Sequence, residues 1–308
     1  MFNADLERAI FEALVYSDIF EYPLQLDELH RYLPMRAQVN ELSVALKSLN
    51  GRVGKQDDFY FLAGHDEFVD IRKQREARSQ ALLPHAMRYG KILGSLPFIR
   101  MVALTGSLAV LNVSKAADFD YMLVTKKGRV WTARAFALLL NRIAKLFGHT
   151  LCPNLIVSED ALEWSLHDLY SARELFQMIP IMGLDVYQRL MKANEWAKEF
   201  LPNSDAAGGS VTRHHDGQRP SWSRAVELLL RGKLGDKFEA WEMQRKIARF
   251  SKQAGFGEET VFNAEVCQGN FHHHRKWTRE VFQEQLRKLN LESDSLLLAA
   301  TGASSLIP

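Results

Sequence analysis

The residue types and spacing most suited to chemistry lie in residues 104–125, LTGSLAVLNVSKAADFDYMLVT. An apolar run ends at Gly106-Ser107, ten residues intervene, and Asp118-Phe119-Asp120 opens a second apolar run. Because residues i and i+2 of a strand point the same way, the two aspartates are expected to project from one face while Phe119 packs into the core. Two convergent carboxylates are hard oxygen ligands that suit Mg²⁺, an ion that also binds substrate phosphates.

The Gly106-Ser107 pair predicts a turn that binds phosphate. Glycine permits a tight turn and a close approach of the backbone to a ligand. Ser107 and the amides after it are expected at the N-terminus of a short helix, where phosphate is favoured. An Asp-x-Asp pattern alone usually marks two solvated acids, so the Gly-Ser pair upstream is what favours a metal and triphosphate site.

This stretch, within residues 97–160, resembles the DNA polymerase β-like nucleotidyltransferase superfamily. The resemblance implies that Gly106 and Ser107 hold a nucleoside triphosphate and that Asp118 and Asp120 bind two metal ions, Mg²⁺ or Mn²⁺. It also implies transfer of a nucleoside monophosphate to an acceptor hydroxyl with release of pyrophosphate. The partner it names is a nucleoside triphosphate, and it leaves the acceptor unknown.

Active members of that superfamily commonly present a third carboxylate on a following strand. Here that strand is predicted at residues 150–158, TLCPNLIVS, and Asn154 is the residue expected to face the site. An amide can ligate a metal weakly but cannot act as a base. Glu159 and Asp160 follow, and for them a helix-capping role is favoured. Two functions therefore stay open: a transferase that draws a base from these acids or from the helical region, or a weak or inactive nucleotide-binding sensor or scaffold.

The other reactive or charged groups are expected to have surface or structural roles. Consecutive histidines on a helix point about 100° apart, so residues 272–274 (HHH) predict a surface basic patch rather than a metal site. The basic run at residues 72–78 is favoured as a solvated helix face. Cys152 is expected in the core, because no histidine partner is indicated nearby.

The elements that position the site begin with a unit over residues 1–64. Apolar spacing predicts helices at 4–20, 24–33 and 37–49, then two short strands around Asp57-Asp58, which is the element order of a winged helix. This unit holds six Lys/Arg against ten Asp/Glu, a net charge of −4. DNA-binding modules are usually basic. Contact with protein, or a structural role, is therefore favoured ahead of DNA binding.

The fold class predicted is α+β: a small nucleotidyltransferase α/β domain, an N-terminal winged-helix domain and a C-terminal helical region. A connecting helix is expected over 65–96, kinked at Pro84. The α/β domain at 97–160 is expected to contain strands at 98–106, 121–125 and 150–158 and a helix at 130–147. The remaining segments are a helical extension over 161–202 (helices at 161–169, 171–178 and 184–200), a linker at 203–220, C-terminal helices over 221–291 and a tail at 292–308.

Composition sets the outer bounds. Of 308 residues, 47% are hydrophobic and 25% charged, which is ordinary globular composition, and the net charge of +2 gives no global attraction to nucleic acid. Two cysteines without a CxxC partner favour a reducing, cytoplasmic setting. The N-terminal segment carries acids within its apolar run, unlike a signal peptide. Apolar stretches fall far short of the roughly 20 residues of a membrane span, so a soluble protein without a membrane partner is expected.

Overall fold

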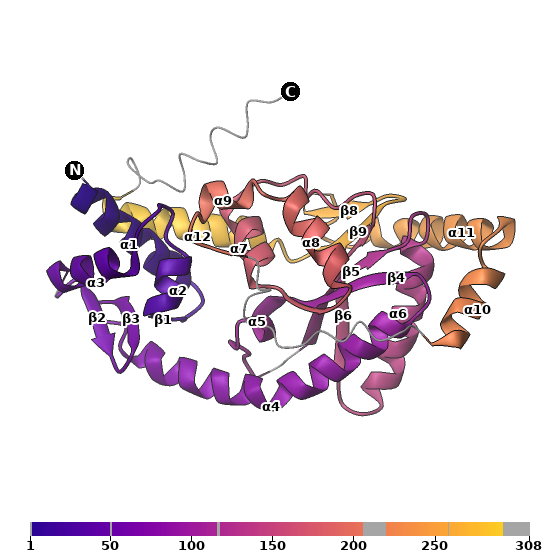
Figure 1. The fold of residues 1–308 in the computed structure, drawn as a ribbon, viewed down its shortest axis with the longest axis horizontal. Helices are drawn as coiled ribbons and strands as arrows, with labels where there is room; N and C mark the ends of the chain where they lie inside the picture. The colour runs from indigo at the N-terminus through magenta and orange to yellow at the C-terminus, as the bar shows by residue number, and fades with distance from the viewer. Residues whose placement is uncertain (1, 50, 116–117, 206–219, 258, 292–308) are drawn as a thin grey trace, which may run out of the picture.

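The computed structural model describes residues 2–49, 51–115, 118–205, 220–257 and 259–291. Helices and strands are mixed along the chain, and the strands form two sheets, one of three strands and one of six (Figure 1). Within the described ranges, no helix is long and apolar enough to cross a membrane. Most of the predicted linker (206–219) and the tail (292–308) lie outside the described residues.

The N-terminal unit consists of three helices and a small antiparallel sheet. Its elements are α1 (Phe2–Asp18), β1 (Leu24–Gln25), α2 (Leu26–Arg31), α3 (Val39–Ser48), β2 (Val53–Gln56) and β3 (Phe59–Leu62), with strand order β1-β3-β2. The predicted order of three helices and a hairpin is confirmed, with β1 added. The second helix begins later than predicted because Leu24 and Gln25 pair with β3, and a capping box between Gln25 and Glu28 starts it.

The six-stranded sheet has the order β7-β4-β5-β6-β9-β8. Its strands are β4 (Ile99–Leu104), β5 (Asp118–Thr125), β6 (Thr150–Ser158), β7 (Ile179–Met182), β8 (Thr260–Phe262) and β9 (Val266–Gly269). Neighbouring strands are antiparallel except β5 and β6, which are parallel and joined through the crossover helix α6 (Val130–Lys145). The register places the C-terminal ends of β4 and β9 and the N-terminal ends of β5, β6 and β7 along one edge.

Three strands of this sheet were not expected from the sequence. β7 lies in the segment predicted as a helical extension, and β8 and β9 lie in the segment predicted as C-terminal helices. They are strands of three or four residues at or near the sheet margins, and β7 contains Pro180, which an edge strand tolerates. Such short segments carry too little alternation of apolar and polar residues to be recognised from the sequence. The sheet therefore has six strands where the sequence predicted three.

The predicted helix over 161–169 is wrong. The chain from 161 to 168 contains no regular element, and α7 (Leu169–Gln177) begins only after Asp168, whose Oδ1 accepts a hydrogen bond from the Ser171 amide at 2.8 Å. The other helices of this region are α8 (Leu184–Ala193) and α9 (Ala197–Phe200). The connecting helix α4 (Glu67–Ser95) is continuous through Pro84 and curves along the molecule in Figure 1.

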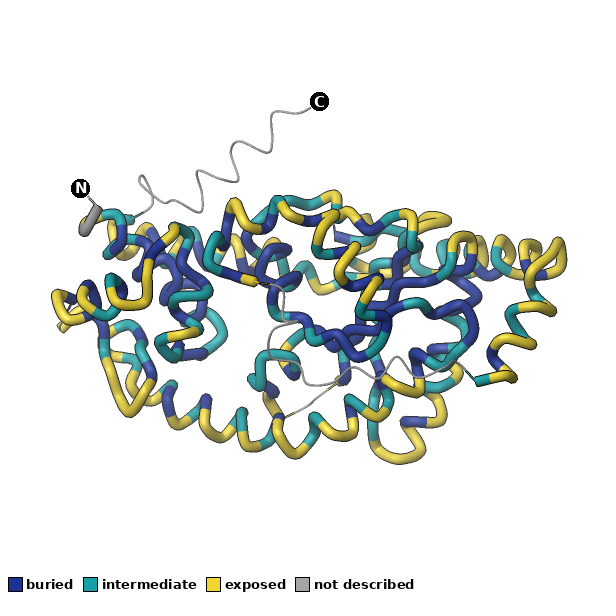
Figure 2. Tube along the Cα trace, viewed as in Figure 1, coloured by how far each residue is buried: buried dark blue, intermediate teal, exposed yellow. Residues whose placement is uncertain are grey.

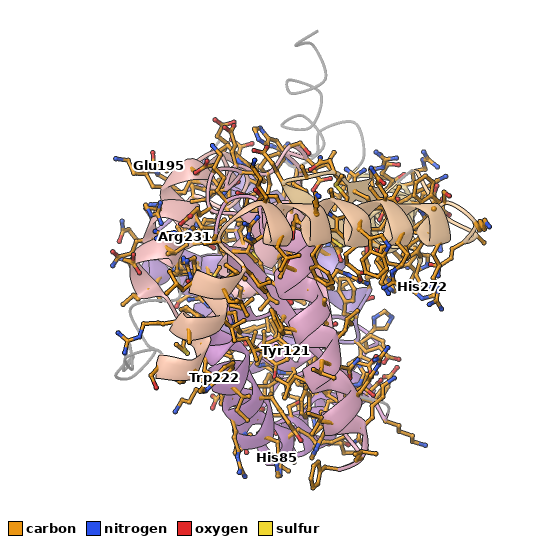
Figure 3. The ribbon with its side chains drawn as sticks, turned by 90° about the vertical axis from the view of Figure 1, so that its right-hand side faces the viewer. His85, Tyr121, Glu195, Trp222, Arg231 and His272 are labelled. Carbon is orange, nitrogen blue, oxygen red and sulfur yellow. The ribbon has the colours of Figure 1, made fainter. Side chains whose placement is uncertain are left out.

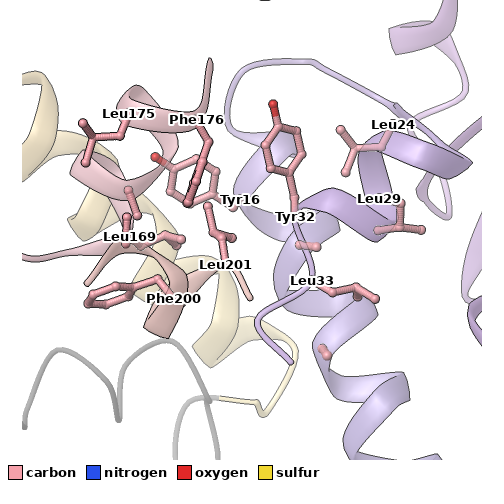
Figure 4. Close-up of a cluster of buried hydrophobic side chains, with 14 of the residues drawn as sticks. Tyr16, Leu24, Leu29, Tyr32, Leu33, Leu169, Leu175, Phe176, Phe200 and Leu201 are labelled. Atoms are coloured by element: carbon pink, nitrogen blue, oxygen red, sulfur yellow. The ribbon is translucent and has the colours of Figure 1, made fainter. Parts of the chain in front are cut away.

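Each face of the larger sheet has its own core. Phe119, Tyr121 and Leu123 pack with α4 and α6 on one face, and Figure 3 labels Tyr121 next to α6. The Tyr121 hydroxyl donates to the Ala86 carbonyl of α4 at 2.7 Å. Met122 and Val124 face the opposite way, into a core shared with α7, α8 and the N-terminal unit. Figure 2 shows the central strands buried, and Figure 4 shows side chains of the N-terminal unit, of α7 and of the end of α9 meeting in this second cluster.

The C-terminal helices pack against both cores. They are α10 (Ser221–Leu229), α11 (Lys233–Phe250) and α12 (His274–Lys288). α11 caps the N-terminus of α6, because the Glu239 carboxylate accepts hydrogen bonds from the amides of Trp131 (2.8 Å) and Thr132 (2.7 Å). α12 packs on α1, where the rings of Phe282 and Tyr16 have centroids 5.7 Å apart.

The Glu239→Ala substitution should remove the cap on α6. Trp131 and Thr132 are fully buried, so their amides would lose a partner where water cannot replace it, at a cost of about 1–3 kcal/mol. Urea denaturation should show the free energy of unfolding falling by that amount. Glu280→Ala, at an exposed position on α12, is the control and should change it by less than about 0.5 kcal/mol. Equal stability of the two variants would contradict the cap.

Candidate functional site

A cleft of about 1000 Å³ runs along the edge of the sheet where β4 ends and β5 and β6 begin. Each of the five residues predicted to form the site contributes to its lining. The cleft is completed by α7, by the N-terminal unit and by the loop between β9 and α12. The predicted site residues that line it are Gly106, Ser107, Asp118, Asp120 and Asn154.

Asp118 and Asp120 lie on one face at the start of β5, as their spacing predicts. Phe119, between them, is 1% exposed and belongs to the core on the opposite face. Asp118 is exposed and Asp120 is partly buried. Burial, reinforced by the charge of Asp118, raises the pKa of Asp120 to about 6, against the lowering effect of a hydrogen bond with the Cys152 thiol. The pair is therefore a focus of negative charge that a cation would stabilise.

The Gly106 turn lies directly against the Asp120 carboxylate. Gly106 has φ +67°, and a Cβ atom there would stand 2.5 Å from Asp120 Oδ2. The Thr105 amide donates to the Asp120 carbonyl at 2.9 Å, which fixes the turn beside the strand. The helix that follows, α5 (Gly106–Ala109), is a single turn, so amides of the turn rather than a helix dipole are available to an anion. The buried Thr105 Oγ1, which lines the cleft, has no hydrogen-bond partner among the described residues.

Asn154 and Cys152 share the position facing the aspartates. Cys152 lies directly across from Asp120, and Leu155 lies across from Met122, so Asn154 is the extra residue of a bulge in β6. The Asn154 Oδ1 atom is buried and has no hydrogen-bond partner within the described chain. Cys152 lines the cleft, contrary to the core position predicted for it; burial and the nearby Asp120 raise its pKa to about 12, so it stays a thiol.

Glu174 is the acidic residue of the site that strand-based reasoning missed. It lies on α7, lines the cleft, and has its pKa raised to about 7, first by burial and then by the charge of Asp120. The signal in the sequence is a polar stripe, with Tyr170, Glu174 and Gln177 at i, i+4 and i+7 on a helix whose other positions are mostly apolar and buried. The sequence does not indicate which strand edge this stripe faces, because that depends on how α7 packs against the sheet.

Glu159 and Asp160 do not reach the cleft. They follow the opposite end of β6, where the Glu159 side chain accepts from the Lys127 amide at 3.2 Å and Asp160 pairs with the Lys127 ammonium at 2.7 Å. The helix-capping role favoured for them is wrong, because no helix begins there.

The histidine run lies at the surface, as expected, with His272 and His274 exposed, whereas part of the basic run departs from expectation. α12 begins at His274, and the rings of His272 and His274 lie 5.8 Å apart on the rim of the cleft, with His272 at the surface in Figure 3. In the basic run, Arg72 is buried and bound to Glu28 at 2.6 and 2.8 Å, so the solvated face favoured for it is wrong. Arg75 and Arg78 bind the loop after Ser107 through Asn112 (3.3 Å) and the Val113 carbonyl (3.2 Å).

The donor atoms of the cleft suit a hard divalent cation. Asp118 and Asp120 supply carboxylates, and the unpartnered Asn154 Oδ1 supplies an amide oxygen. Among the described residues, no three or more His, Cys, Asp or Glu side chains converge as a metal cluster. Mg²⁺ fits such a donor set, because it binds through one or two carboxylates and completes its octahedron with waters and substrate phosphates.

Comparison with known proteins adds no relative. No protein-family model matches the chain, and no curated protein or solved structure matches it. The resemblance to nucleotidyltransferases therefore rests on the residues of the chain that carry it.

The Gly106→Ala substitution should disturb the site as well as the backbone. A non-glycine residue in the left-handed region costs about 1–2 kcal/mol, and here its Cβ would also displace the Asp120 carboxylate. We expect lower stability by urea denaturation and weaker Mn²⁺ binding by calorimetry. Gly128→Ala is the matched control: it has φ +68° with nothing within 4 Å, so it should carry the backbone strain alone. Unchanged Mn²⁺ binding in Gly106→Ala would contradict the contact.

Glu174 should make the metal-free protein less stable as pH rises. A carboxyl whose pKa increases on folding from 4.5 to about 7 binds more protons in the native state, so stability is lost as pH rises from 5 to 8. In chelator, Glu174→Gln should match wild type near pH 5 and exceed it by about 1–3 kcal/mol at pH 8. Glu280→Gln should keep the wild-type slope. Parallel pH profiles of wild type and Glu174→Gln would overturn the assignment.

Proposed function

We propose that this cleft binds a nucleoside triphosphate with Mg²⁺ and transfers its nucleoside monophosphate to an acceptor hydroxyl. The observation that carries the proposal is the Asp120 carboxylate lying against the Gly106 turn, with Asp118 on the same strand face. In this view the centre of the larger sheet is a minimal nucleotidyltransferase domain, and the N-terminal unit is a winged helix. Neither assignment is drawn from similarity to a known protein.

In the proposed complex, Asp118, Asp120 and the Asn154 amide hold Mg²⁺ or Mn²⁺. When bound, the ion neutralises phosphate charge and the charge that develops on the departing pyrophosphate. The amides of Gly106 and Ser107 hold the triphosphate, because the turn leaves no side chain between the backbone and the ligand. The buried Thr105 hydroxyl, unpartnered within the described residues, supplies a further donor or acceptor to this part of the cleft.

We propose that Glu174 acts as the general base, because the amide of Asn154 cannot act as one. A carboxyl with a pKa of about 7 is matched to proton transfer near neutral pH. In the proposed step the acceptor O–H bond breaks and its proton passes to Glu174. The acceptor oxygen bonds to the α-phosphorus, and the bond from that phosphorus to pyrophosphate breaks. The arrangement supplies the carboxylate from α7 instead of from the third strand.

The alternative, a nucleotide-binding sensor or scaffold, is favoured by one observation. The third strand presents an amide and a thiol where a carboxylate is expected, since Cys152 lies across from Asp120 and Asn154 occupies the bulge. A sensor would need the triphosphate turn and the aspartates but no base. The two proposals therefore differ in whether Glu174 takes part in turnover.

We also propose that the N-terminal unit serves the cleft and contacts protein, ahead of any role with DNA. Tyr16, Ser17, Phe20 and Tyr22 line the cleft, so the unit forms one of its walls. In the turn between β2 and β3, Asp57 is paired with Lys73, and the N-terminal unit has a net negative charge. A phosphate backbone would meet repulsion there.

Triphosphate binding and turnover should separate in variants of the site. The double variant Asp118→Asn, Asp120→Asn should lose Mg²⁺-dependent binding of a labelled triphosphate. Glu174→Gln should keep that binding and lose about 10²–10⁴-fold in pyrophosphate release, the usual worth of a general base. Each of the common triphosphates is tested with Mg²⁺ and with Mn²⁺, using metabolite extract as the source of acceptor.

Two further variants sharpen this experiment. Asp160→Asn, whose side chain pairs with Lys127 away from the cleft, should leave both measurements unchanged. Asn154→Asp should not accelerate transfer if Glu174 is the base, and acceleration would place the missing carboxylate on the third strand. Binding without any turnover in wild type would favour the sensor. Turnover at the wild-type rate in the double variant Asp118→Asn, Asp120→Asn would refute the proposed site.

A further inference from the structure

Arg173, the neighbour of Glu174 on α7, is a buried cation on the wall of the cleft. The residue is 4% exposed, and it lines the cleft. Its Nε atom is buried and has no hydrogen-bond partner among the described residues. Burial lowers the pKa of Arg173. Glu28, the acid whose charge it senses, is already bound by both terminal nitrogens of Arg72.

Two tyrosine rings fix the orientation of this guanidinium. Its Cζ lies 3.7 Å from the centroid of Tyr32 and 4.6 Å from that of Tyr16. Both rings are buried where the N-terminal unit meets α7 (Figure 4), and Gln177 donates to the Tyr32 hydroxyl at 3.3 Å. Aromatic rings contact the faces of a guanidinium and leave its N–H edges available to an acceptor.

A second unpartnered polar group lines the same cleft. Ser17, next to Tyr16 on α1, is 3% exposed, and its Oγ has no hydrogen-bond partner among the described residues. A buried charge without a partner is costly, and apolar packing between α7 and the N-terminal unit would not need it. A guanidinium and a hydroxyl that line one cleft, each with a buried atom that has no partner among the described residues, are donors that an oxyanion binds.

The position of Arg173 relative to the proposed chemistry indicates which substrate carries that oxyanion. The Gly106 turn lies against Asp120, and Glu174 is close enough to Asp120 for its charge to be felt. Arg173, the sequence neighbour of Glu174 on α7, lies against Tyr16 and Tyr32 of the N-terminal unit. The buried cation therefore stands beside the proposed base on α7, whereas the triphosphate turn follows β4.

We propose that Arg173 and Ser17 bind an oxyanionic group of the acceptor, a carboxylate or a phosphate, and thereby hold the acceptor hydroxyl at Glu174. This inference rests on the proposed transferase function. It names the substrate class that the sequence left open: a hydroxylated small molecule, or the end of a larger one, that carries a negative charge. Arg173 positions the acceptor and takes no part in proton transfer.

The experiment compares wild type with Arg173→Met, which keeps the length of the side chain without its charge, and Arg173→Lys. The affinity for inorganic phosphate and for malonate is measured by calorimetry, with a non-hydrolysable triphosphate and Mg²⁺ present to occupy the Gly106 turn, and again without them. We expect wild type to bind at least one of the two oxyanions and Arg173→Met to bind it about 10- to 100-fold more weakly. Which oxyanion binds distinguishes a phosphorylated from a carboxylated acceptor.

Stability and triphosphate affinity supply the controls. Arg173→Met should melt at or above the wild-type temperature, whereas Arg72→Met should melt lower, because it removes both charge-assisted hydrogen bonds from a buried arginine to the half-buried Glu28. Triphosphate affinity should be unchanged in Arg173→Met. Arg173→Lys keeps the charge without the planar fork and should retain part of the affinity. Oxyanion binding that survives in a folded Arg173→Met variant, or that is absent from wild type, would overturn the subsite.

Two other outcomes separate this inference from the proposed function. A loss of triphosphate affinity in Arg173→Met equal to its loss of oxyanion affinity would overturn the acceptor assignment and place Arg173 at the triphosphate. Oxyanion binding that depends on Arg173, in a wild-type protein that binds no triphosphate, would support the subsite and refute the transferase.

Discussion

The structure depends on a concentration of negative charge that is only partly exposed to water. Asp118, Asp120 and Glu174 line one cleft from two elements, and burial together with mutual repulsion raises the pKa of the latter two. Charged groups held this way are costly unless a cation or a proton compensates them. The strand pairing, the glycine turn and the docking of α7 place these carboxylates on the lining of one cleft, which is why we interpret the cleft as the functional part of the molecule.

The N-terminal unit helps to hold that arrangement. Tyr16 and Tyr32 contact Arg173 on α7, so the helix that carries Glu174 is fixed from the side of the N-terminal unit. At its other end, α7 is fixed by Asp168, which accepts from the Ser171 amide and pairs with Arg275 of α12 at 2.8 Å. α12 in turn packs on α1 through the Phe282 and Tyr16 rings. The wall of the cleft is therefore continuous with a core that several distant segments share.

The sequence predicted those parts of the site that depend on local geometry. The period of a strand placed Asp118 and Asp120 on one face with Phe119 behind them, and the bounds of the third strand, 150–158, agree with β6. What escaped prediction depends on tertiary packing. Glu174 lines the same cleft as the aspartates only because α7 docks on that sheet face, and the bulge at Asn154 shifts which residues of β6 face the cleft. The short strand β7 draws its pairing from β4 rather than from a pattern of its own.

The cost of the buried groups bears on the choice between an enzyme and a sensor. A protein that only recognised a metal and a triphosphate would need Asp118, Asp120 and the Gly106 turn. Glu174 and Arg173 lie beyond that set, and burial disfavours the charged form of both. Desolvating a carboxyl and a guanidinium side by side on one helix costs free energy that packing alone would avoid. A second substrate, with a hydroxyl to deprotonate and a negative charge to anchor, accounts for both groups at once, which is why we favour transfer over sensing.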